Sequence, residues 1–377
     1  MGARILQEAE WTMPFEGEEH YATIVELPFR KDVWRQNATP AARAFATVIK
    51  AIAGFEKVIA IADPRALAQN RTAFAPICLD SNIAVVALPY NDSWARDNLP
   101  VFVRDSQGAV GAVDFGFNAW GGKFNGLYAD WALDNALGKS LLKGPLAMPV
   151  QSHKDFILEG GSIHTNGKGT LLTTEECLLS PGRNPGLSQA QIETELKTTL
   201  GQRKVIWLPY GVFNDETSGH VDNMACFLDE THVLLAYPTD TSDPQWARSE
   251  ADLKVLEKAT TADGKKLSVL KMPLPGPLFA TAAEAAGLEY DALGSKPRQA
   301  GDRLAASYVN FYMGSRFIIM PSFGVPEDRK AQEILQDFFR ESKKIITVPG
   351  REILLGGGNI HCITKQIPAG TIKAAAA

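Results

Sequence analysis

Apolar stretches that alternate with turn-forming residues recur along the chain and predict a series of strand–turn–strand units. Five units are expected, at Pro100–Phe115, Gly161–Leu179, Val221–Tyr237, Leu304–Met320 and a last one that opens at Gly356. The first three follow one another at intervals of roughly 60 residues, a spacing typical of a modular array. The strings Gly160–His164 and Gly357–His361 also differ only at their third position. We therefore expect duplicated modules.

Helical periodicity fills the intervals between these units, at Pro40–Phe55, Ser188–Leu200, Gln245–Thr260 and Asp328–Arg340. Short apolar runs typical of buried strands usually follow a helix, at Val58–Ala62, Val205–Leu208 and Ile345–Val348. The alternation predicts an α/β fold built from about five similar modules in a ring. Since no linker rich in glycine, serine or proline interrupts the pattern, we expect one domain over residues 1–377.

The composition is that of an ordinary globular protein, with 45% hydrophobic and 21% charged residues in a chain of 377. A net charge of −5 without a stripe of lysine and arginine argues against nucleic-acid binding. The first ten residues carry acids and no apolar signal-peptide core, and no stretch reaches the ~18 apolar residues of a membrane span. We therefore expect a cytoplasmic protein that binds neither nucleic acid nor membrane.

The four cysteines, Cys78, Cys177, Cys226 and Cys362, are widely scattered. Their spacing shows neither the paired ligands of a zinc site nor a disulfide framework, so we expect no metal. Most free cysteines are buried apolar side chains. The first three are accordingly predicted to pack in the core.

Charged or reactive side chains stand at the entrances of the predicted units, and in a ring the ends of successive strands converge on the axis. These residues are Asp97, Glu159, His220, Asp222 and Cys362. Taken singly, each has an ordinary explanation. Asp97 fits a surface turn, Glu159 a turn cap, and His220 a buried core histidine. Cys362 likewise fits an inert buried thiol.

The pair His220 and Asp222 is more informative, because residues two apart in an extended strand project from the same face. Cys362 follows the glycine run at 356–358, which allows close approach of a ligand. In a strand the adjacent His361 would face away from Cys362, so we predict a structural role for it.

The combination has a chemical logic that the separate explanations lack. A guanidinium group is planar and cationic, and carboxylates such as Asp97 and Asp222 match its paired N–H groups. The same cation favours the thiolate of Cys362, which would be the nucleophile. His220 would serve as general acid and then as general base, oriented by Glu159. This chemistry needs neither metal nor cofactor.

At these residues the chain resembles the agmatine deiminase family, within the guanidine-modifying group that also contains bacterial peptidylarginine deiminases. The resemblance covers nearly the whole chain and lies in six strings, Phe29–Arg35, Asn91–Pro100, Phe117–Gly122, Leu158–His164, Asn214–Asn223 and Pro349–Cys362. It implies a pentein fold, a pseudo-fivefold propeller of αββαβ modules, and a homo-oligomer. It also implies conversion of agmatine and water to N-carbamoylputrescine and ammonia without a metal.

Carried over to this sequence, the family pattern gives the five residues above the same roles. It also places Trp94 in the pocket wall and Glu216 towards the amine end of the substrate. Two positions depart from the pattern, Leu27 where the family usually has tryptophan and Leu99 where it usually has glycine. Both are expected near the pocket.

Three alternatives remain open from the sequence. The enzyme could act on free or peptidyl arginine, or it could be an amidinotransferase in which an amine replaces water. A ring-shaped binding protein without catalysis fits less well, because it needs no thiol at position 362. The acids Asp215 and Glu216 favour a substrate that ends in an amine over one that ends in a carboxylate.

Overall fold

The computed structural model describes residues 11–290 and 294–372. Five of its sheets share one pattern, in which an antiparallel hairpin is extended by a strand parallel to its second member. In the first, β5 (Val101–Asp105) pairs antiparallel with β6 (Val110–Gly116), and β6 pairs parallel with β7 (Val150–Ile157). A parallel third strand requires a crossover, which helices usually supply. The predicted α/β class is confirmed.

Three further sheets repeat this pattern along the chain. They are β8 (Ile163–Thr165), β9 (Thr170–Thr174) and β10 (Lys204–Leu208); β11 (Ala225–Phe227), β12 (His232–Ala236) and β13 (Ser268–Met272); and β16 (Tyr312–Met313), β17 (Phe317–Ser322) and β18 (Lys344–Pro349). Their hairpins and that of β5 and β6 match the first four predicted units, although β6 and β17 run one and two residues past the predicted ends. Two of the predicted buried strands coincide with β10 and β18.

The fifth sheet is assembled from distant parts of the chain. Strand β19 (Thr364–Pro368) pairs antiparallel with β2 (His20–Glu26), which pairs parallel with β3 (Val58–Ala62), and β4 (Ile83–Ala87) follows. The last predicted unit, expected to open at Gly356, is therefore not a local hairpin. Two smaller pairings complete the sheets, β1 (Trp11–Thr12) on β5 and β14 (Leu278–Phe279) on β15 (Arg303–Leu304).

The long helices lie where periodicity predicts them, at α1 (Thr39–Ala53), α8 (Gln189–Leu200), α10 (Pro244–Leu256) and α12 (Glu327–Phe339). Ser188 and Gln191 form a reciprocal capping box that satisfies two backbone donors at the start of α8. Helix α6 (Ala132–Lys143) is as long as α8 but was not predicted. Further helices are shorter, namely α2 (Pro64–Gln69), α3 (Arg71–Cys78), α5 (Gly122–Asn125), α7 (Glu175–Leu178), α11 (Ala282–Ala285) and α13 (Arg351–Leu354).

Short helical turns precede the strands at the predicted site residues. Asp97 lies on α4 (Ala95–Asn98), Glu159 precedes the 3-10 turn η1 (Gly160–Ser162), and His220 precedes α9 (Val221–Met224). The extended strand expected at His220 and Asp222 is therefore wrong. Gly219 has φ 84°, and the hydroxyl of Thr217 accepts a hydrogen bond from the N–H of His220, so the backbone turns into α9 there.

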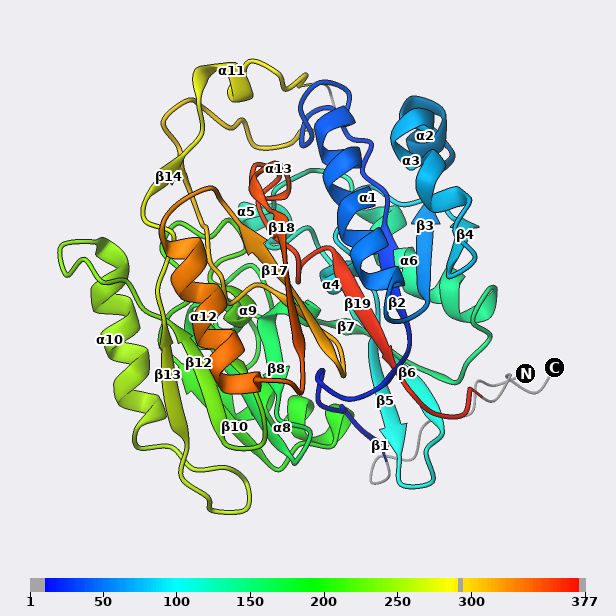
Figure 1. Ribbon diagram of the computed structural model, residues 1–377. Helices are drawn as coiled ribbons and strands as arrows, with labels where there is room; N and C mark the ends of the chain where they lie inside the picture. The colour runs from blue at the N-terminus through cyan, green and yellow to red at the C-terminus, as the bar shows by residue number, and fades with distance from the viewer. Residues whose placement is uncertain (1–10, 291–293, 373–377) are drawn as a thin grey trace.

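Apolar clusters fill the space between helices and sheets. One contains Ile24 of β2 and Phe45 of α1, and another contains Leu234 of β12 and Leu335 of α12. Figure 1 shows α10 at the edge of the molecule and the short helices α4 and α9 in its interior. The residues on these inner turns are therefore held by packed elements on several sides. Among the helices of the described residues, none is long and apolar enough to cross a membrane.

Candidate active site

Gly161 marks the point where three predicted site residues meet. A Cβ atom on this glycine would lie 2.6 Å from Nδ1 of His220, 2.8 Å from Oδ2 of Asp222 and 2.9 Å from Oδ1 of Asp97. These separations are too short for ordinary packing, so the position requires a residue without a side chain. The structure thus brings together Asp97 from α4, Asp222 from α9 and His220 from the loop before α9.

Cys362 lies in a turn after α13 and is 3% exposed. Its Sγ is 3.7 Å from Oδ2 of Asp222 and accepts a hydrogen bond from Nδ2 of Asn310 at 3.2 Å. Burial raises the pKa of the Cys362 thiol well above its usual value, and the carboxylates of Asp222 and Asp97 raise it further. In the absence of a cation the sulfur therefore carries a proton at neutral pH.

The two carboxylates are held in different ways. Both oxygens of Asp97 accept hydrogen bonds, Oδ1 from the N–H of Gly161 and Oδ2 from Nε1 of Trp120, each at 2.9 Å. Asp222 has Oδ2 2.8 Å from Nδ1 of His361, whereas its buried Oδ1 has no partner among the described residues. Burial raises the pKa of Asp97. Burial also acts to raise the pKa of Asp222, but His361 outweighs it, so the net effect is a lowered pKa.

His220 is fully buried between two acids. Its Nδ1 lies 3.8 Å from Oδ2 of Asp97, and its Nε2 lies 3.8 Å from Oε2 of Glu159. Burial lowers the pKa of His220, but Asp97, Cys177 and Glu159 outweigh it and raise the pKa well above the usual value. The ring is accordingly an imidazolium at neutral pH, ready to donate a proton.

Glu159 is anchored by an arginine that sequence analysis did not identify. Nε of Arg183 donates to this carboxylate at 2.9 Å, and the same guanidinium donates to the carbonyls of Trp120 and Thr217. Burial raises the pKa of Glu159, but Arg183 and His220 outweigh it and bring the pKa to about 2. Glu159 is therefore ionised and fixed beneath the ring of His220.

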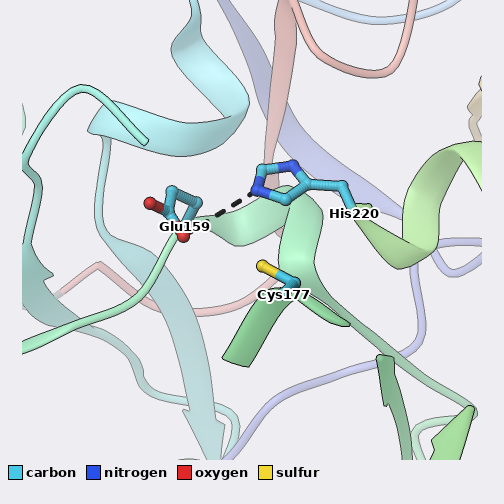
Figure 2. A group of neighbouring side chains, drawn as sticks. All are labelled: Glu159, Cys177 and His220. Atoms are coloured by element: carbon cyan, nitrogen blue, oxygen red, sulfur yellow. Dashed lines mark ion pairs between the residues drawn. The ribbon is translucent and has the colours of Figure 1, made fainter. Parts of the chain in front are cut away.

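Figure 2 shows Glu159, Cys177 and His220 side by side, with the sulfur directed between the other two side chains. Their ligand atoms lie within 4.8 Å of one another, a set that a soft divalent cation could use. Arg183 already donates to Glu159, however, and the protonated ring of His220 has no lone pair to offer a metal ion. The cluster is better explained as an enclosure for the imidazolium.

The expectations for the other cysteines meet mixed outcomes. Cys177 and Cys226 are buried as predicted, but Cys177 borders His220 in addition to packing in the core. The core prediction for Cys78 is wrong, since this residue is exposed. Cys78 is the last residue of α3, a helix that buries only one side against the core, so its side chain stays at the surface.

A narrow cavity of about 30 Å³, with room for about two water molecules, leads to Cys362. Its walls include Trp94, Asp97, Trp120, Tyr128, Glu216, Lys296 and Arg298. It adjoins a larger cavity of about 450 Å³, and Glu216, Lys296 and Arg298 line both. A ligand larger than water therefore reaches the thiol only when side chains between the two cavities move.

The two residues that the resemblance adds both line this cavity. The indole N–H of Trp94 donates to Asp92 at 2.8 Å, and its ring packs against that of Trp34. Glu216 accepts two hydrogen bonds from Arg298, at 3.1 Å from Nε and 2.6 Å from Nη2. The acid expected to meet the substrate's amine is thus already paired with a cation.

The two departures from the family pattern do not line the cavity, although Leu99 directly follows the helix that carries Asp97. Leu27 and Leu99 are both buried, and neither lines the cavity that leads to Cys362. The backbone carbonyl of Leu27 accepts a hydrogen bond from the hydroxyl of Tyr90 at 2.6 Å. Their contribution is therefore to packing behind the site.

The family model of Porphyromonas-type peptidyl-arginine deiminases matches residues 12–368. An agmatine deiminase of Pseudomonas aeruginosa (strain LESB58) is 50% identical over 357 residues, which covers 95% of each chain. One of Stutzerimonas stutzeri (strain A1501) is 49% identical over 96% of each. The chain belongs to the agmatine deiminase family. The solved agmatine deiminase of Enterococcus faecalis, 37% identical, agrees with a TM-score of 0.90 over 97% of this chain and 99% of that one.

Membership of the agmatine deiminase family, a family of hydrolytic enzymes, confirms the resemblance inferred from the sequence. Several residues that shape the site were nevertheless missed, namely Trp120, Arg183, Arg298 and Asn310, and His361 was given only a structural role. Trp120 and His361 both lie in strings that carry the resemblance, so the sequence could have marked them as site residues. The other three give no local signal, because each reaches the site from a segment whose placement depends on the tertiary fold.

Proposed function

We propose that this protein is an agmatine deiminase, which converts agmatine and water to N-carbamoylputrescine and ammonia. The observation that carries the proposal is the unpartnered, buried Oδ1 of Asp222, a carboxylate whose other oxygen lies 3.7 Å from the sulfur of Cys362. A buried carboxylate oxygen without a donor is costly unless a ligand supplies one. A guanidinium supplies both the N–H group and the positive charge.

Binding of the guanidinium prepares the nucleophile. Asp222 and Asp97 hold the planar cation, and Cys362 lies beside the carbon to be attacked. The charge of the bound cation lowers the pKa of the thiol, which burial and the two acids otherwise raise. The thiol proton leaves to solvent, and the thiolate forms only when substrate is present.

In the first half-reaction, the thiolate of Cys362 forms a bond to the guanidinium carbon and gives a neutral tetrahedral adduct. The imidazolium of His220 donates a proton to one amino group, and the C–N bond breaks as ammonia departs. The remaining group is an amidino thioether cation attached to sulfur. Glu159 holds the ring of His220 in place throughout.

In the second half-reaction, the now neutral His220 removes a proton from water, and the resulting hydroxide attacks the same carbon. The C–S bond then breaks with its electron pair on sulfur, and the hydroxyl proton of the adduct returns to the thiolate. The product is a urea. His220 is again an imidazolium and Cys362 again a thiol, so no redox partner is needed.

The amine end of agmatine would face Glu216 in this arrangement. The relatives at 49–50% identity are agmatine deiminases, which supports agmatine as the substrate. One observation favours a second candidate, because Arg298 and Lys296 line the same cavity and could meet the α-carboxylate of arginine. Since Arg298 is already paired with Glu216, we favour agmatine.

The decisive experiment measures ureido product and ammonia from agmatine and from arginine in parallel. We expect turnover with agmatine and a lower kcat/KM, by on the order of 10² or more, with arginine. Cys362→Ala should abolish turnover and keep the fold, whereas Cys226→Ala, a buried thiol outside the cavity walls, should keep both. Comparable rates with both substrates would overturn the agmatine assignment.

The fold around this site can also be inferred. We propose that the five sheets of common pattern are the αββαβ modules of one pentein propeller and that residues 1–377 form a single catalytic domain. The shared hairpin and parallel-strand pattern supports this arrangement. The inner turns that carry Asp97, His220 and Asp222 fit the axis of such a ring. A homo-oligomer stays a prediction from the resemblance.

A further inference from the structure

A second histidine lies directly beside the proposed nucleophile, and the reaction described above does not use it. His361 is 3% exposed. Its Nδ1 is 2.8 Å from Oδ2 of Asp222, and its Nε2 is 3.0 Å from both oxygens of Glu16. The prediction of a structural role rested on a strand that is absent here, because residues 360–363 form a turn in the structure.

Each ring nitrogen of His361 faces a carboxylate, so each is required to carry a hydrogen. Burial and Arg96 lower the pKa of His361, but Glu16 and Asp222 outweigh them, and the net effect is a raised pKa. Glu16 is itself held by Nη1 of Arg96 at 2.8 Å. Two acids and two cations therefore alternate in a buried network that ends at Asp222.

This network decides which oxygen of Asp222 is free. His361 occupies Oδ2, while Oδ1 is buried and without a partner among residues 11–290 and 294–372. Without His361, only the contact of the Cys362 sulfur with Oδ2, at 3.7 Å, would distinguish the two oxygens of Asp222. The anchor at Glu16 lies in the segment between β1 and β2, so the orientation of α9 is tied to a distant part of the chain.

We propose that His361, held by Glu16, is a positioning residue that directs the free oxygen of Asp222 towards the guanidinium of the substrate. The inference rests on the proposed function and deepens it. His361 does not touch the reacting atoms in this arrangement. Its effect on substrate binding passes through Asp222.

The inference has a distinctive pH signature. The ionisable groups that interact with Asp222 from the surrounding elements are His361, His220, Arg96, Asp97, Asp215, Cys226 and Cys362. Loss of the cation at position 361 removes the largest influence that keeps the pKa of Asp222 low. Asp222 then takes up a proton at higher pH, so the acid limb of kcat/KM for agmatine should move to higher pH.

The test compares two substitutions of His361, one that keeps the hydrogen bond to Asp222 and one that keeps the hydrogen bond to Glu16. In His361→Asn the amide nitrogen takes the place of Nδ1 and can still donate to Asp222. In His361→Gln it takes the place of Nε2 and can reach only Glu16. His164 provides the matched control, because it is also buried and lies 3.5 Å from Glu16 but makes no hydrogen bond to Asp222.

For His361→Gln we expect KM for agmatine to rise by on the order of tenfold, with the acid limb displaced to higher pH. KM for agmatine should be lower in His361→Asn than in His361→Gln. In His164→Gln the KM should stay within about threefold of that of the unmodified protein. Thermal unfolding of each variant is measured alongside, and if the glutamine variant does not fold, the asparagine variant carries the pH test.

Equal KM values in the two His361 variants, or an unmoved acid limb, would overturn the inference. So would a His164→Gln variant that behaves like His361→Gln. The unmodified protein and Cys362→Ala are assayed first. If the former does not act on agmatine, or the latter retains its rate, the proposed function itself fails, and that result is distinct from a failure confined to His361.

Discussion

The thiol of Cys362 lies in surroundings that oppose its ionisation, so its reactivity depends on whether a cation binds beside it. Burial, Asp222 and Asp97 all raise its pKa. Hydrogen bonds to the sulfur from the backbone of Asn359 and the side chain of Asn310 offset these groups only in part. A free protein with an unreactive thiol is protected from oxidation and alkylation until a cation binds.

The first prediction concerns alkylation of Cys362 by iodoacetamide in the free protein. Because only the thiolate reacts, the rate should be low at pH 7 and rise by about tenfold per pH unit through the alkaline range. The rate at each cysteine is obtained by mass spectrometry of peptides. Exposed Cys78 is the internal control and should be labelled faster. Equally fast labelling of Cys362 at pH 7 would contradict the protonated state.

The second prediction concerns Gly161, where an added Cβ would meet the three central side chains. Gly161→Ala places a methyl group within 2.9 Å of His220, Asp222 and Asp97, so one of them must move. We expect kcat/KM for agmatine to fall by about 10² or more, since misplacement of about 1 Å commonly has this effect. Gly186→Ala is the control, because nothing lies within 4 Å of a Cβ there. Similar activity in both variants would show that the site tolerates the shift.

Single residues differ in how much of their role the sequence reveals. Cys362 and His220 stand out because a thiol and an imidazole are reactive groups, and because the sequence places glycines before Cys362 and Asp222 two residues after His220. Arg183 acts through partners far away in the chain, so no local pattern identifies it. His361 stands beside Cys362 in the sequence, but its contact with Asp222 depends on the tertiary fold. The pairing of Glu216 with Arg298 is hidden for the same reason. The sequence predicts an acid at the amine end, but its neutralising partner depends on the tertiary fold.

At the scale of elements, local signals and long-range pairings are predicted unequally. Helix α8 starts at a capping box and ends at Gly201, so its bounds follow from nearby residues. The pairing of β2 with β19 has no local signal, because its register depends on closure of the whole chain. The turn at His220 was mistaken for a strand, since short helices lack the periodicity that identifies long ones.

The third prediction concerns the docking of α10. Asp252 is buried, and its Oδ1 accepts a hydrogen bond from the N–H of Tyr210 after β10. Burial raises the pKa of Asp252 to about 8 from an ordinary value of 3.8. Between these pH values the folded state holds a proton that the unfolded state lacks, so stability falls as pH rises, by about 1.4 kcal/mol per pH unit at most.

Asp252→Asn removes this titration. Thermal or urea unfolding should show little difference from the unmodified protein near pH 4 and a more stable variant at pH 8. Asp337→Asn, at an exposed position of α12, should leave the pH dependence unchanged. A stability difference at Asp252 that is the same at both pH values would indicate that the acid is not buried as a neutral group.

At the scale of the whole molecule, access to the thiol depends on segments that are distant in the chain. Arg298 bridges Glu216 and the carbonyl of Gly356, and it stands between the outer and inner cavities. Lys296 of the same segment donates to the carbonyl of Asn125. Entry of substrate therefore disturbs contacts among three separate regions.

The fourth prediction concerns Arg298. Its charge repels the amine of agmatine and attracts the carboxylate of arginine, so Arg298→Gln should raise the ratio of kcat/KM for agmatine to that for arginine by about tenfold. The ratio is informative even if both rates fall. Arg303→Gln, which removes a cation of the outer cavity paired with Asp243, should leave the ratio within about threefold. A lower ratio in Arg298→Gln would contradict this role.

The pairing of Val25 with Thr364 sets the order in which the molecule is completed during its synthesis. A ribosome delivers β2 long before β19, so the edge of β2 waits without its neighbour while the sheets in between form. We expect the turn that carries Cys362, just before β19, to be fixed only when that strand docks. A chain that stops short of β19 should therefore be inactive towards guanidines, and its open strand edge is where self-association would begin.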